Sequence, residues 1–372
     1  MKKILLFLTT LLPFAAFAQL NGDGYYRIQN NQSERYIILK DNAIGEVNES
    51  SASADVSNLT SWSGFDYVKS SPGSVFYIQQ VGTKYNLIAQ GTSIYDITGG
   101  KKYIDIIARD GGAYYLFEVT ASGVAGHLYD SNDNSTQGSV TTKGDKEYMY
   151  WRLKPINTSD NYIGLQPTVQ TSDGWYGTVY ASYPFKLASS NVTVYYVDGV
   201  HEGQFQLKKV DSEVIPAATP LVFKSNSNDP AQNKVIPLFE TTTAPTDNKL
   251  GGTYFSSTNR KHKVFVEYDA TTMRVLGKDS NGNLVFTTAK STDLVESKYI
   301  PMNTCWLNVA GLTGDFKLVK RDEFTGVSSI EVNTKKNATK GTFTLSGVQV
   351  DDTKTLRPGI YIKDGKKIVI NN

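Results

Sequence analysis

The chain has 372 residues, which predicts two or three domains because an average domain has roughly 150 residues. Its 38 basic and 36 acidic residues leave a formal charge of +2, which removes the electrostatic case for nucleic acid or acidic lipid as a partner. A single cysteine excludes a disulfide framework and a cysteine-based zinc site. The 23 tyrosines and the low share of charged residues, 20%, favour pleated β-structure over helices.

The N-terminus has the pattern of a secretory signal peptide. Lys2 and Lys3 form a positive start, an apolar run over 4–17 follows, and Ala18 ends a small-x-small cleavage site. The run is too short to span roughly 30 Å of hydrocarbon, and no cysteine follows the cleavage site to carry a lipid anchor. We therefore expect residues 1–18 to be removed, leaving a neutral, secreted or outer-surface protein that does not insert into the membrane.

Residues 24–157 read as a series of short strands. Runs of Tyr, Ile, Val and Phe are bounded by Gly, Asn, Asp and Ser, which is typical of a barrel or sandwich. Aromatic-led strands at Tyr25, Phe76 and Tyr114 each open a unit with a second strand after a polar turn, and Trp151 begins a closing strand. Three such units suggest a barrel with pseudo-threefold symmetry.

Two of these runs carry a resemblance to a known family. The start Tyr25-Tyr26-Arg27-Ile28 and the closing run Tyr150-Trp151-Arg152-Leu153 resemble those of ricin-type β-trefoil modules. The resemblance covers residues 24–156 and implies a trefoil fold, together with the sugar binding that such modules often have. The Gln-x-Trp signature and the disulfide cysteines of that family are absent here, so the resemblance supports the fold more than the sugar-binding role.

A second β-rich zone spans residues 161–322. The segment 225–248, rich in Asn, Thr, Pro and Asp, is predicted to be a long surface loop. A Gly-Thr strand at 177–178, Pro184-Phe185, and Ile215-Pro216-Ala217 before Thr219-Pro220 resemble a β-rich module common in exported Bacteroidetes proteins. This resemblance implies a β-sandwich-like domain and export, with no assigned catalysis.

The C-terminal zone, 326–372, is a small β module after a polar linker. Asp364-Gly365 between two alternating runs is the strongest hairpin signal in the chain. Leu345-Ser346-Gly347, Pro358-Gly359-Ile360-Tyr361 and Gly365-Lys366-Lys367 resemble the C-terminal module of secreted and surface Bacteroidetes proteins that is related to type IX sorting domains. The resemblance implies that this tail engages the export machinery.

The sequence holds few signs of catalysis or of a metal site, and no cofactor is expected. The three histidines lie far apart, and no nucleophile elbow, His-Glu-x-x-His motif or phosphate loop is present. Gly111-Gly112 and Gly251-Gly252 are interpreted as turn glycines, and Cys305 as a buried structural thiol. The acidic run from Asp130 lacks the glycine and glutamate of an EF-hand and is interpreted as a polar turn, with a weak calcium site as the alternative.

Aromatic rings flanked by amides and carboxylates are the remaining functional signal, since sugars stack on rings and bond to such groups. Most rings of the first zone are expected in its core, and Tyr103 and Trp151 are assigned there. Trp62 lies in a serine-rich stretch and Tyr95 adjoins Asp96 at a strand end, so these rings are expected to be exposed. The predicted ligand-binding residues are Trp62, Asp66, Tyr95 and Asp96.

The sequence thus predicts an all-β protein with a β-trefoil-like N-terminal domain, a β-sandwich-like central domain and a small C-terminal β module. Its expected function is non-catalytic binding of an extracellular glycan or glycoprotein through the N-terminal domain. A surface adhesin or structural protein that binds protein partners is one alternative. A secreted glycan-degrading hydrolase, which needs two acids facing one cleft, is the other.

Overall fold

The computed structural model describes residues 20, 23–39, 59–64, 68–90, 92–95, 103–121, 124–131, 137–143, 147–254, 266–311, 313–319, 341–344, 349–350, 356–363 and 366–370. The elements named among them are strands and three-residue 3-10 helices, so the protein is all-β, which confirms the predicted class. Within these ranges we find no helix with the length and apolar character needed to cross a membrane. The chain divides into two compact units, Met1–Phe324 and Thr325–Asn372.

The first eleven strands form one sheet. They are β1 (Gly24–Asn30), β2 (Tyr36–Leu39), β3 (Leu59–Trp62), β4 (Phe76–Val81), β5 (Lys84–Ala89), β6 (Thr92–Tyr95), β7 (Tyr103–Arg109), β8 (Tyr114–Ala121), β9 (Val124–Asp130), β10 (Gln137–Lys143) and β11 (Tyr150–Pro155). Three 3-10 helices interrupt them: η1 (Pro72–Ser74), η2 (Asp110–Gly112) and η3 (Glu147–Met149).

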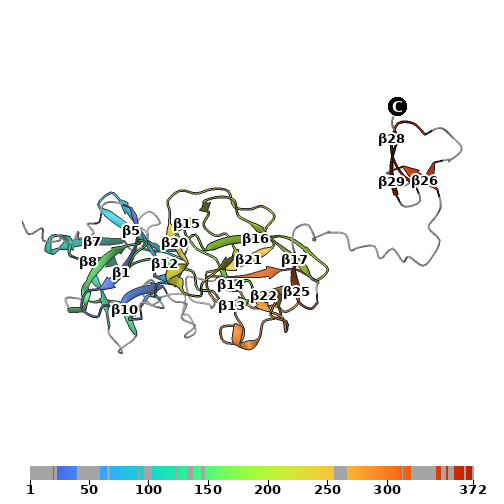
Figure 1. The fold of residues 1–372 in the computed structure, drawn as a ribbon. Coiled ribbons are helices and arrows are strands. Elements are labelled where there is room, and N and C mark those ends of the chain that lie inside the picture. Colours follow the sequence, from blue (N-terminus) through green and yellow to red (C-terminus); the bar gives the residue numbers. More distant parts are fainter. Residues whose placement is uncertain are drawn as a thin grey trace, which may run out of the picture. The chain divides into compact units, whose positions relative to one another are not determined.

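Six of these strands close into a barrel. β1 pairs with β4 and β11, β8 pairs with β11 and β7, and β5 pairs with β4 and β7. Four of these strands, β1, β5, β7 and β8, are labelled in Figure 1. The other strands lie in three excursions between ring strands: β2 and β3, then β6, then β9 and β10. Three units of ring strand, excursion and ring strand give the β-trefoil-like arrangement.

The structure corrects the predicted start of the middle unit. The sequence suggested that the strand at Phe76 opens the second unit, but this strand is β4, which pairs with β1 and closes the first unit. The second unit opens with β5 instead. β4 begins with the aromatic pair Phe76-Tyr77, as β1 and β8 begin near the pairs Tyr25-Tyr26 and Tyr114-Tyr115, so the residue pattern alone did not separate a closing strand from an opening one.

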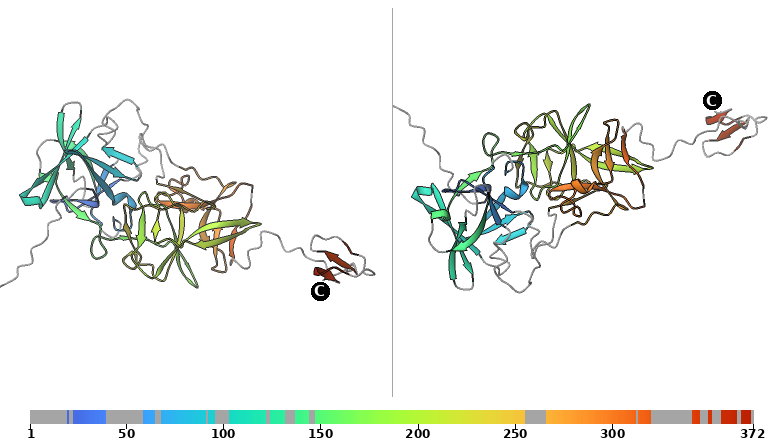
Figure 2. Two further views of the ribbon diagram at one scale, coloured as in Figure 1. Left: turned by 90° about the horizontal axis from the view of Figure 1, so that it is seen from above. Right: turned by 90° about the horizontal axis from the view of Figure 1, so that it is seen from below.

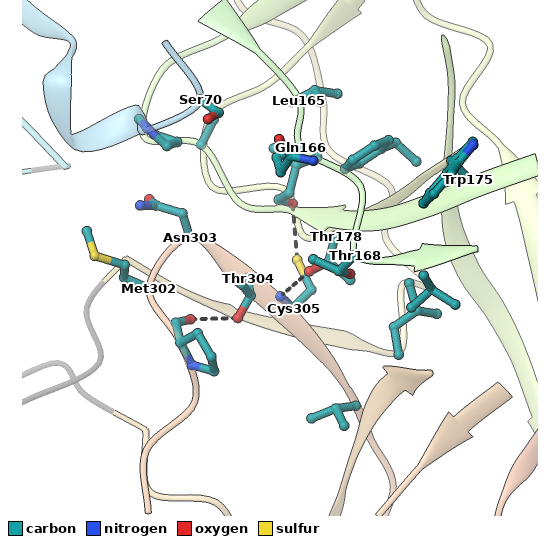
Figure 3. A pocket seen from close by; sticks show the side chains of 18 of the residues that line it. Ser70, Leu165, Gln166, Thr168, Trp175, Thr178, Met302, Asn303, Thr304 and Cys305 are labelled. Atoms are coloured by element: carbon teal, nitrogen blue, oxygen red, sulfur yellow. Dashed lines mark hydrogen bonds between the residues drawn. The ribbon is translucent and has the colours of Figure 1, made fainter. Parts of the chain in front are cut away.

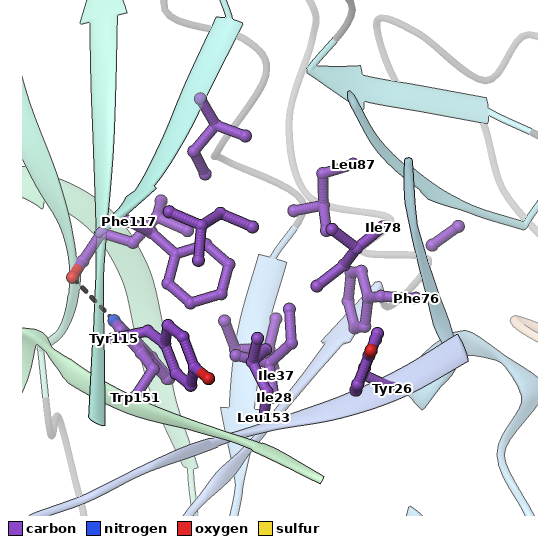
Figure 4. Packing of buried hydrophobic residues seen from close by; sticks show 14 residues of the cluster. Tyr26, Ile28, Ile37, Phe76, Ile78, Leu87, Tyr115, Phe117, Trp151 and Leu153 are labelled. Atoms are coloured by element: carbon purple, nitrogen blue, oxygen red, sulfur yellow. Dashed lines mark hydrogen bonds between the residues drawn. The ribbon is translucent and has the colours of Figure 1, made fainter. Parts of the chain in front are cut away.

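Alternation along the ring strands explains why this sequence fills a barrel. Each ring strand contributes two residues, spaced by two, to one buried cluster, because side chains alternate between the faces of a strand. Trp151 and Leu153 of β11 show this pattern, and the buried Trp151 Nε1 donates a hydrogen bond to the Leu128 carbonyl at 2.9 Å (Figure 4). Burying each large apolar side chain contributes about 1.5–3 kcal/mol, so this cluster is the main source of the barrel's stability.

Residues 161–319 form two sheets. The four-stranded sheet has the order β12 (Ile163–Gly164), β20 (Lys234–Pro237), β15 (Phe185–Leu187) and β18 (Val214–Ile215). The ten-stranded sheet has the order β13 (Val169–Thr171), β14 (Gly174–Val179), β19 (Leu221–Ser225), β16 (Val192–His201), β17 (Gln204–Lys209), β25 (Phe316–Val319), β23 (Leu284–Thr287), β22 (Met273–Lys278), β24 (Thr304–Asn308) and β21 (Leu250–Thr253). The helices η4 (Pro230–Gln232) and η5 (Ser291–Asp293) lie in the connections.

The larger sheet has a core on each face. One core lies between the two sheets and joins residues such as Phe185 and Val235 of the smaller sheet to Val194 and Phe223 of the larger. On the other face the ten-stranded sheet curls, so that strands from both of its ends share a second core (Figure 2). This arrangement is sandwich-like on one side and barrel-like on the other.

The structure overturns two local expectations in this region. The segment 225–248 is not one long loop, because β20 lies inside it and pairs with both β12 and β15. Gly251 and Gly252 are not turn glycines but lie within β21. A Cβ at Gly251 would come within 2.5 Å of the Trp306 ring, and one at Gly252 within 2.2 Å of the Tyr180 ring. The pair is therefore needed for close packing of two rings on a strand.

The second unit holds a four-stranded sheet with the order β27 (Gln349–Val350), β26 (Thr342–Thr344), β28 (Gly359–Lys363) and β29 (Lys366–Ile370). Lys363 pairs with Lys366, so the flanking strands form the predicted hairpin, while Asp364 and Gly365 themselves lie outside the described residues.

Candidate ligand-binding cleft

The structure places only part of the site expected from the sequence. Trp62 ends β3, and its ring is half-buried against Tyr36, Ile38 and Val68 instead of standing exposed. Tyr95 ends β6 opposite Leu87, whereas Asp66 and Asp96 lie outside the described residues. Trp62 is therefore part of a small apolar cluster beside the barrel. A ligand site formed by Trp62, Asp66, Tyr95 and Asp96 stays a prediction.

The other polar groups considered in the sequence have structural partners. Asp130 is fully buried and accepts hydrogen bonds from the hydroxyls of Ser33 and Ser61. His127 lies 3.7 Å from a Glu118 carboxylate oxygen, and His201, at the end of β16, lies 3.6 Å from a Glu202 carboxylate oxygen. Over the parts of the chain that are described, no three His, Cys, Asp or Glu side chains group into a candidate metal site.

A cleft of about 800 Å³ lies in the first unit. It lies beside β14 and β24 of the ten-stranded sheet. Its walls come from three parts of the chain: the β13–β14 hairpin, the segment leading into β24, and residues 70–72 next to η1 (Figure 3). β22 and β23 close the remaining side. A volume of this size is in the range of small-ligand sites.

The β13–β14 hairpin presents a ring and an amide on one wall. Gln170 and Trp175 face each other across the two strands, and Gln166 lines the same wall just before β13. Asp173 in the turn accepts hydrogen bonds from Thr171 Oγ1 at 2.6 Å, Tyr176 Oη at 2.9 Å and Lys224 Nζ at 2.7 Å. This carboxylate therefore braces the turn that positions Trp175.

The hydrogen bonds of the Asp173 carboxylate predict that the free energy of unfolding falls in a defined acidic pH range. Partial burial opposes ionisation, but the hydrogen bonds from Lys224, Thr171 and Tyr176 prevail and lower the pKa of Asp173 to about 2. Because the folded pKa lies below the unfolded value of about 3.9, ionised Asp173 stabilises the fold above pH ~4, and this contribution disappears as the pH falls toward 2. Asp173→Asn should be less stable than the wild type at pH 7, and the gap should close between pH ~4 and ~2.

Urea unfolding followed by circular dichroism across this pH range measures the gap. Asp211→Asn, at an exposed position, is the matched control and should track the wild type at every pH. A gap for Asp173→Asn that stays constant from pH 7 to pH 2 would contradict the assigned brace.

The opposite wall is set by an unusual backbone position. Asn303 has a φ of 57°, its N–H donates to the Thr253 carbonyl at 2.8 Å, and its own carbonyl accepts from the Tyr180 N–H at 3.2 Å. These bonds fix the backbone of Asn303 at the cleft, and its buried Oδ1 has no hydrogen-bond partner among the residues that the structure describes (Figure 3). A buried acceptor without a donor is costly, so this oxygen is suited to an internal water.

Thr304 and Cys305, the next residues on this wall, use their polar groups in hydrogen bonds within the protein. Thr304 Oγ1 donates to the Pro301 carbonyl at 2.6 Å, and the Cys305 N–H donates to Thr178 Oγ1 at 3.2 Å. The Cys305 thiol donates to the Val179 carbonyl, and burial raises its pKa, so it stays protonated. Cys305 is therefore a structural thiol, in agreement with the sequence interpretation.

The third wall is held in place by Arg27, which lies fully buried in β1. Its guanidinium donates to the carbonyls of Val68 and Lys69 and to Ser74 Oγ, on either side of the cleft residues 70–72. It also donates to Asn161 Oδ1 at 2.9 Å and to the Tyr162 carbonyl at 2.7 Å. Burial lowers the pKa of Arg27 to about 10, so the side chain stays charged at neutral pH and links the barrel to the cleft.

Two lysines and one carboxylate are the charged residues among the described residues that line the cleft. Lys278 and Lys290 line the cleft and are exposed. Asp293 is the carboxylate among the lining residues, and it accepts a hydrogen bond from the Lys290 N–H at 2.8 Å. With a ring, several amides and hydroxyls, the cleft can hold a polyhydroxylated ligand reversibly.

Sequence reasoning missed this cleft because its walls are far apart in the chain. A local signal did exist: Gln166, Gln170 and Trp175 lie within one short stretch in which Asp173-Gly174 marks a tight turn. Asn303 gave no such signal, since its role depends on a backbone conformation set by tertiary contacts.

No family model and no curated protein matches this chain. Comparison with solved structures finds a chain described as "Structure and mode of action of a mosquitocidal holotoxin", with 10% identity and a TM-score of 0.26. The similarity covers 77% of this chain and 34% of that one, so the chain spans about a third of the length of the toxin chain.

Proposed function

We propose that this protein is an exported binding protein for an extracellular carbohydrate or glycoconjugate, and that it holds its ligand in the cleft beside β14 and β24. The signal-peptide pattern before Gln19 supports export. The cleft replaces Trp62 and its neighbours as the preferred site, because the Trp62 ring is packed against an apolar cluster.

The observation that carries this proposal is the combination of Trp175, Gln170 and Asn303 around one cleft. An indole ring offers a flat apolar face to the C–H groups of a sugar. The side-chain amides of Gln170 and Asn303 can donate to and accept from its hydroxyls. A hydrolase needs two carboxylates facing each other across a sugar, whereas Asp293 is the one carboxylate among the described residues that line this cleft.

A glycan-array screen of the chain from Gln19 onward tests the proposal. Thr168 is exposed on the cleft wall, so Thr168→Trp should fill the cleft and abolish the glycan binding of the wild type. Thr241→Trp, at an exposed position in the loop after β20, adds the same ring elsewhere and should bind as the wild type does.

Two results would oppose the proposal. One is an array on which the wild-type protein binds no glycan. The other is a Thr168→Trp variant that binds as well as Thr241→Trp, which would place the ligand outside the cleft. Protein partners would then become the leading hypothesis.

A further inference from the structure

A second group of aromatic rings lies at the surface, outside the cleft. Tyr25 of β1 and Tyr77 of β4 are directly opposite each other in the barrel, with ring centroids 5.2 Å apart. Phe239, which follows β20, lies 5.0 Å from the Tyr25 ring and 5.6 Å from the Tyr77 ring. The three rings thus form a triangle, which we call the aromatic triangle.

Contacts with the protein interior hold the aromatic triangle in place. Tyr25 packs against the core between the two central sheets and meets the buried Tyr183 ring edge-on at 5.9 Å. The chain entering Phe239 is fixed because the Leu238 N–H donates to the Pro184 carbonyl at 2.7 Å. A ring held by such contacts loses little conformational entropy when a ligand stacks on it.

Phe239 is nevertheless 59% exposed, the highest value among the large hydrophobic side chains described as exposed. The Phe239 ring packs against the rings of Tyr25 and Tyr77, and much of the rest of the Phe239 ring faces solvent. A single exposed ring is too small for a stable protein interface, which needs on the order of 1,000 Å². It matches the size of one sugar ring.

Polar groups beside the rings complete the surface. The exposed Asp23 carboxylate accepts hydrogen bonds from Tyr77 Oη at 2.9 Å and from the Gln80 N–H at 2.8 Å. Each of its oxygens keeps a lone pair that can accept from a ligand hydroxyl. Glu240, also exposed, follows Phe239 in the chain, and like charges repel, so these two carboxylates disfavour an anionic ligand.

We propose that the aromatic triangle of Tyr25, Tyr77 and Phe239, with Asp23 at its edge, is a second binding surface, and that it takes a neutral saccharide. The sugar stacks its C–H face on Phe239 and places a hydroxyl on the Asp23 carboxylate. None of these four residues lines the cleft, although Tyr183 behind Tyr25 does.

The test uses the full chain from Gln19 onward, with the cleft blocked by Thr168→Trp, so that residual binding reports on the aromatic triangle. The probes are cellohexaose, maltohexaose, xylohexaose and mannohexaose, followed by saturation-transfer NMR and isothermal titration calorimetry. We expect at least one hexasaccharide to bind and Phe239→Ala to weaken it at least tenfold. Thr241→Ala, at a nearby exposed position, is the matched control and should bind unchanged.

A second variant tests the role of the carboxylate. Tyr77→Phe keeps the ring but removes the hydroxyl that holds Asp23, so we expect a smaller loss, roughly threefold. Phe239 is exposed, and thermal melts should confirm that Phe239→Ala folds as the wild type does.

Three outcomes would overturn the proposal. They are the absence of hexasaccharide binding to the cleft-blocked protein up to millimolar concentration, equal affinity of Phe239→Ala and Thr241→Ala, and a self-association of the wild type that Phe239→Ala abolishes. The last, measured by sedimentation, would show that the rings serve contact between copies of the chain. Because the cleft is blocked throughout, failure here is distinguishable from failure of the cleft proposal.

Discussion

Replacing Arg27 by methionine is expected to lower the free energy of unfolding of the first unit by about 3–5 kcal/mol. The substitution keeps an aliphatic stem but withdraws a charged donor from Asn161 Oδ1 and from the Tyr162 carbonyl, both in buried residues. Hydrogen bonds to charged groups contribute about 1.5–3 kcal/mol each, and buried acceptors that lose their donor carry a desolvation penalty. The carbonyls of Val68 and Lys69 suffer less, because other groups also donate to them.

Chemical denaturation followed by tyrosine and tryptophan fluorescence measures this loss. Arg109→Met is the matched control, because Arg109 is exposed and should change stability by no more than about 0.5 kcal/mol. Arg27→Lys should fall between the two, since one ammonium cannot reach all the acceptors of a guanidinium. An Arg27→Met protein as stable as the Arg109→Met control would contradict the role given to this side chain.

Replacing Trp175 by alanine is expected to weaken glycan binding by about 10- to 100-fold. The indole ring is the aromatic surface that the hairpin presents to the cleft, and a ring stacked on a ligand typically contributes ~1–3 kcal/mol, where 1.4 kcal/mol corresponds to tenfold in affinity. Trp175→Phe keeps a ring in place and should retain most of the affinity. The measurement is calorimetric titration with the glycan that gives the strongest signal on the array.

Trp62→Ala serves as the comparison for this prediction, because Trp62 belongs to the site first suggested by the sequence. Its ring packs against Tyr36, Ile38 and Val68, so we expect its loss to reduce stability while leaving glycan affinity within twofold. If Trp62→Ala lost binding and Trp175→Ala kept it, the ligand site would move back to the N-terminal barrel.

Much of the fold was predictable because strands carry their own local signals. The alternation that buries Ile28, Leu87 and Trp151 on one face of their strands is visible in the residues themselves, and so are the turn signals that separate the strands. The hairpin around Asp364-Gly365 was also readable, since few other residue pairs adopt the backbone of a tight turn.

Errors arose where one local pattern fits two places in a fold. Phe76 begins an aromatic-rich strand that looks like the opening of a unit, but pairing with β1 makes it the end of one. Gly251 and Gly252 look like a turn, but they allow the rings of Trp306 and Tyr180 to lie against a strand. β20 lies in a stretch rich in loop residues, and its state is set by its neighbours β12 and β15.

The all-β class, the strand periodicity, the tight turns and the resemblance of the N-terminal region to a trefoil could be predicted from residues close together in the chain, where side-chain alternation and turn geometry act directly. Which rings are buried and where a cleft forms could be learned from the folded chain alone, because Arg27, Trp175 and Asn303 reach the cleft walls from distant segments. Side-chain burial and the backbone geometry of Asn303 depend on contacts between those segments, and no local pattern encodes them.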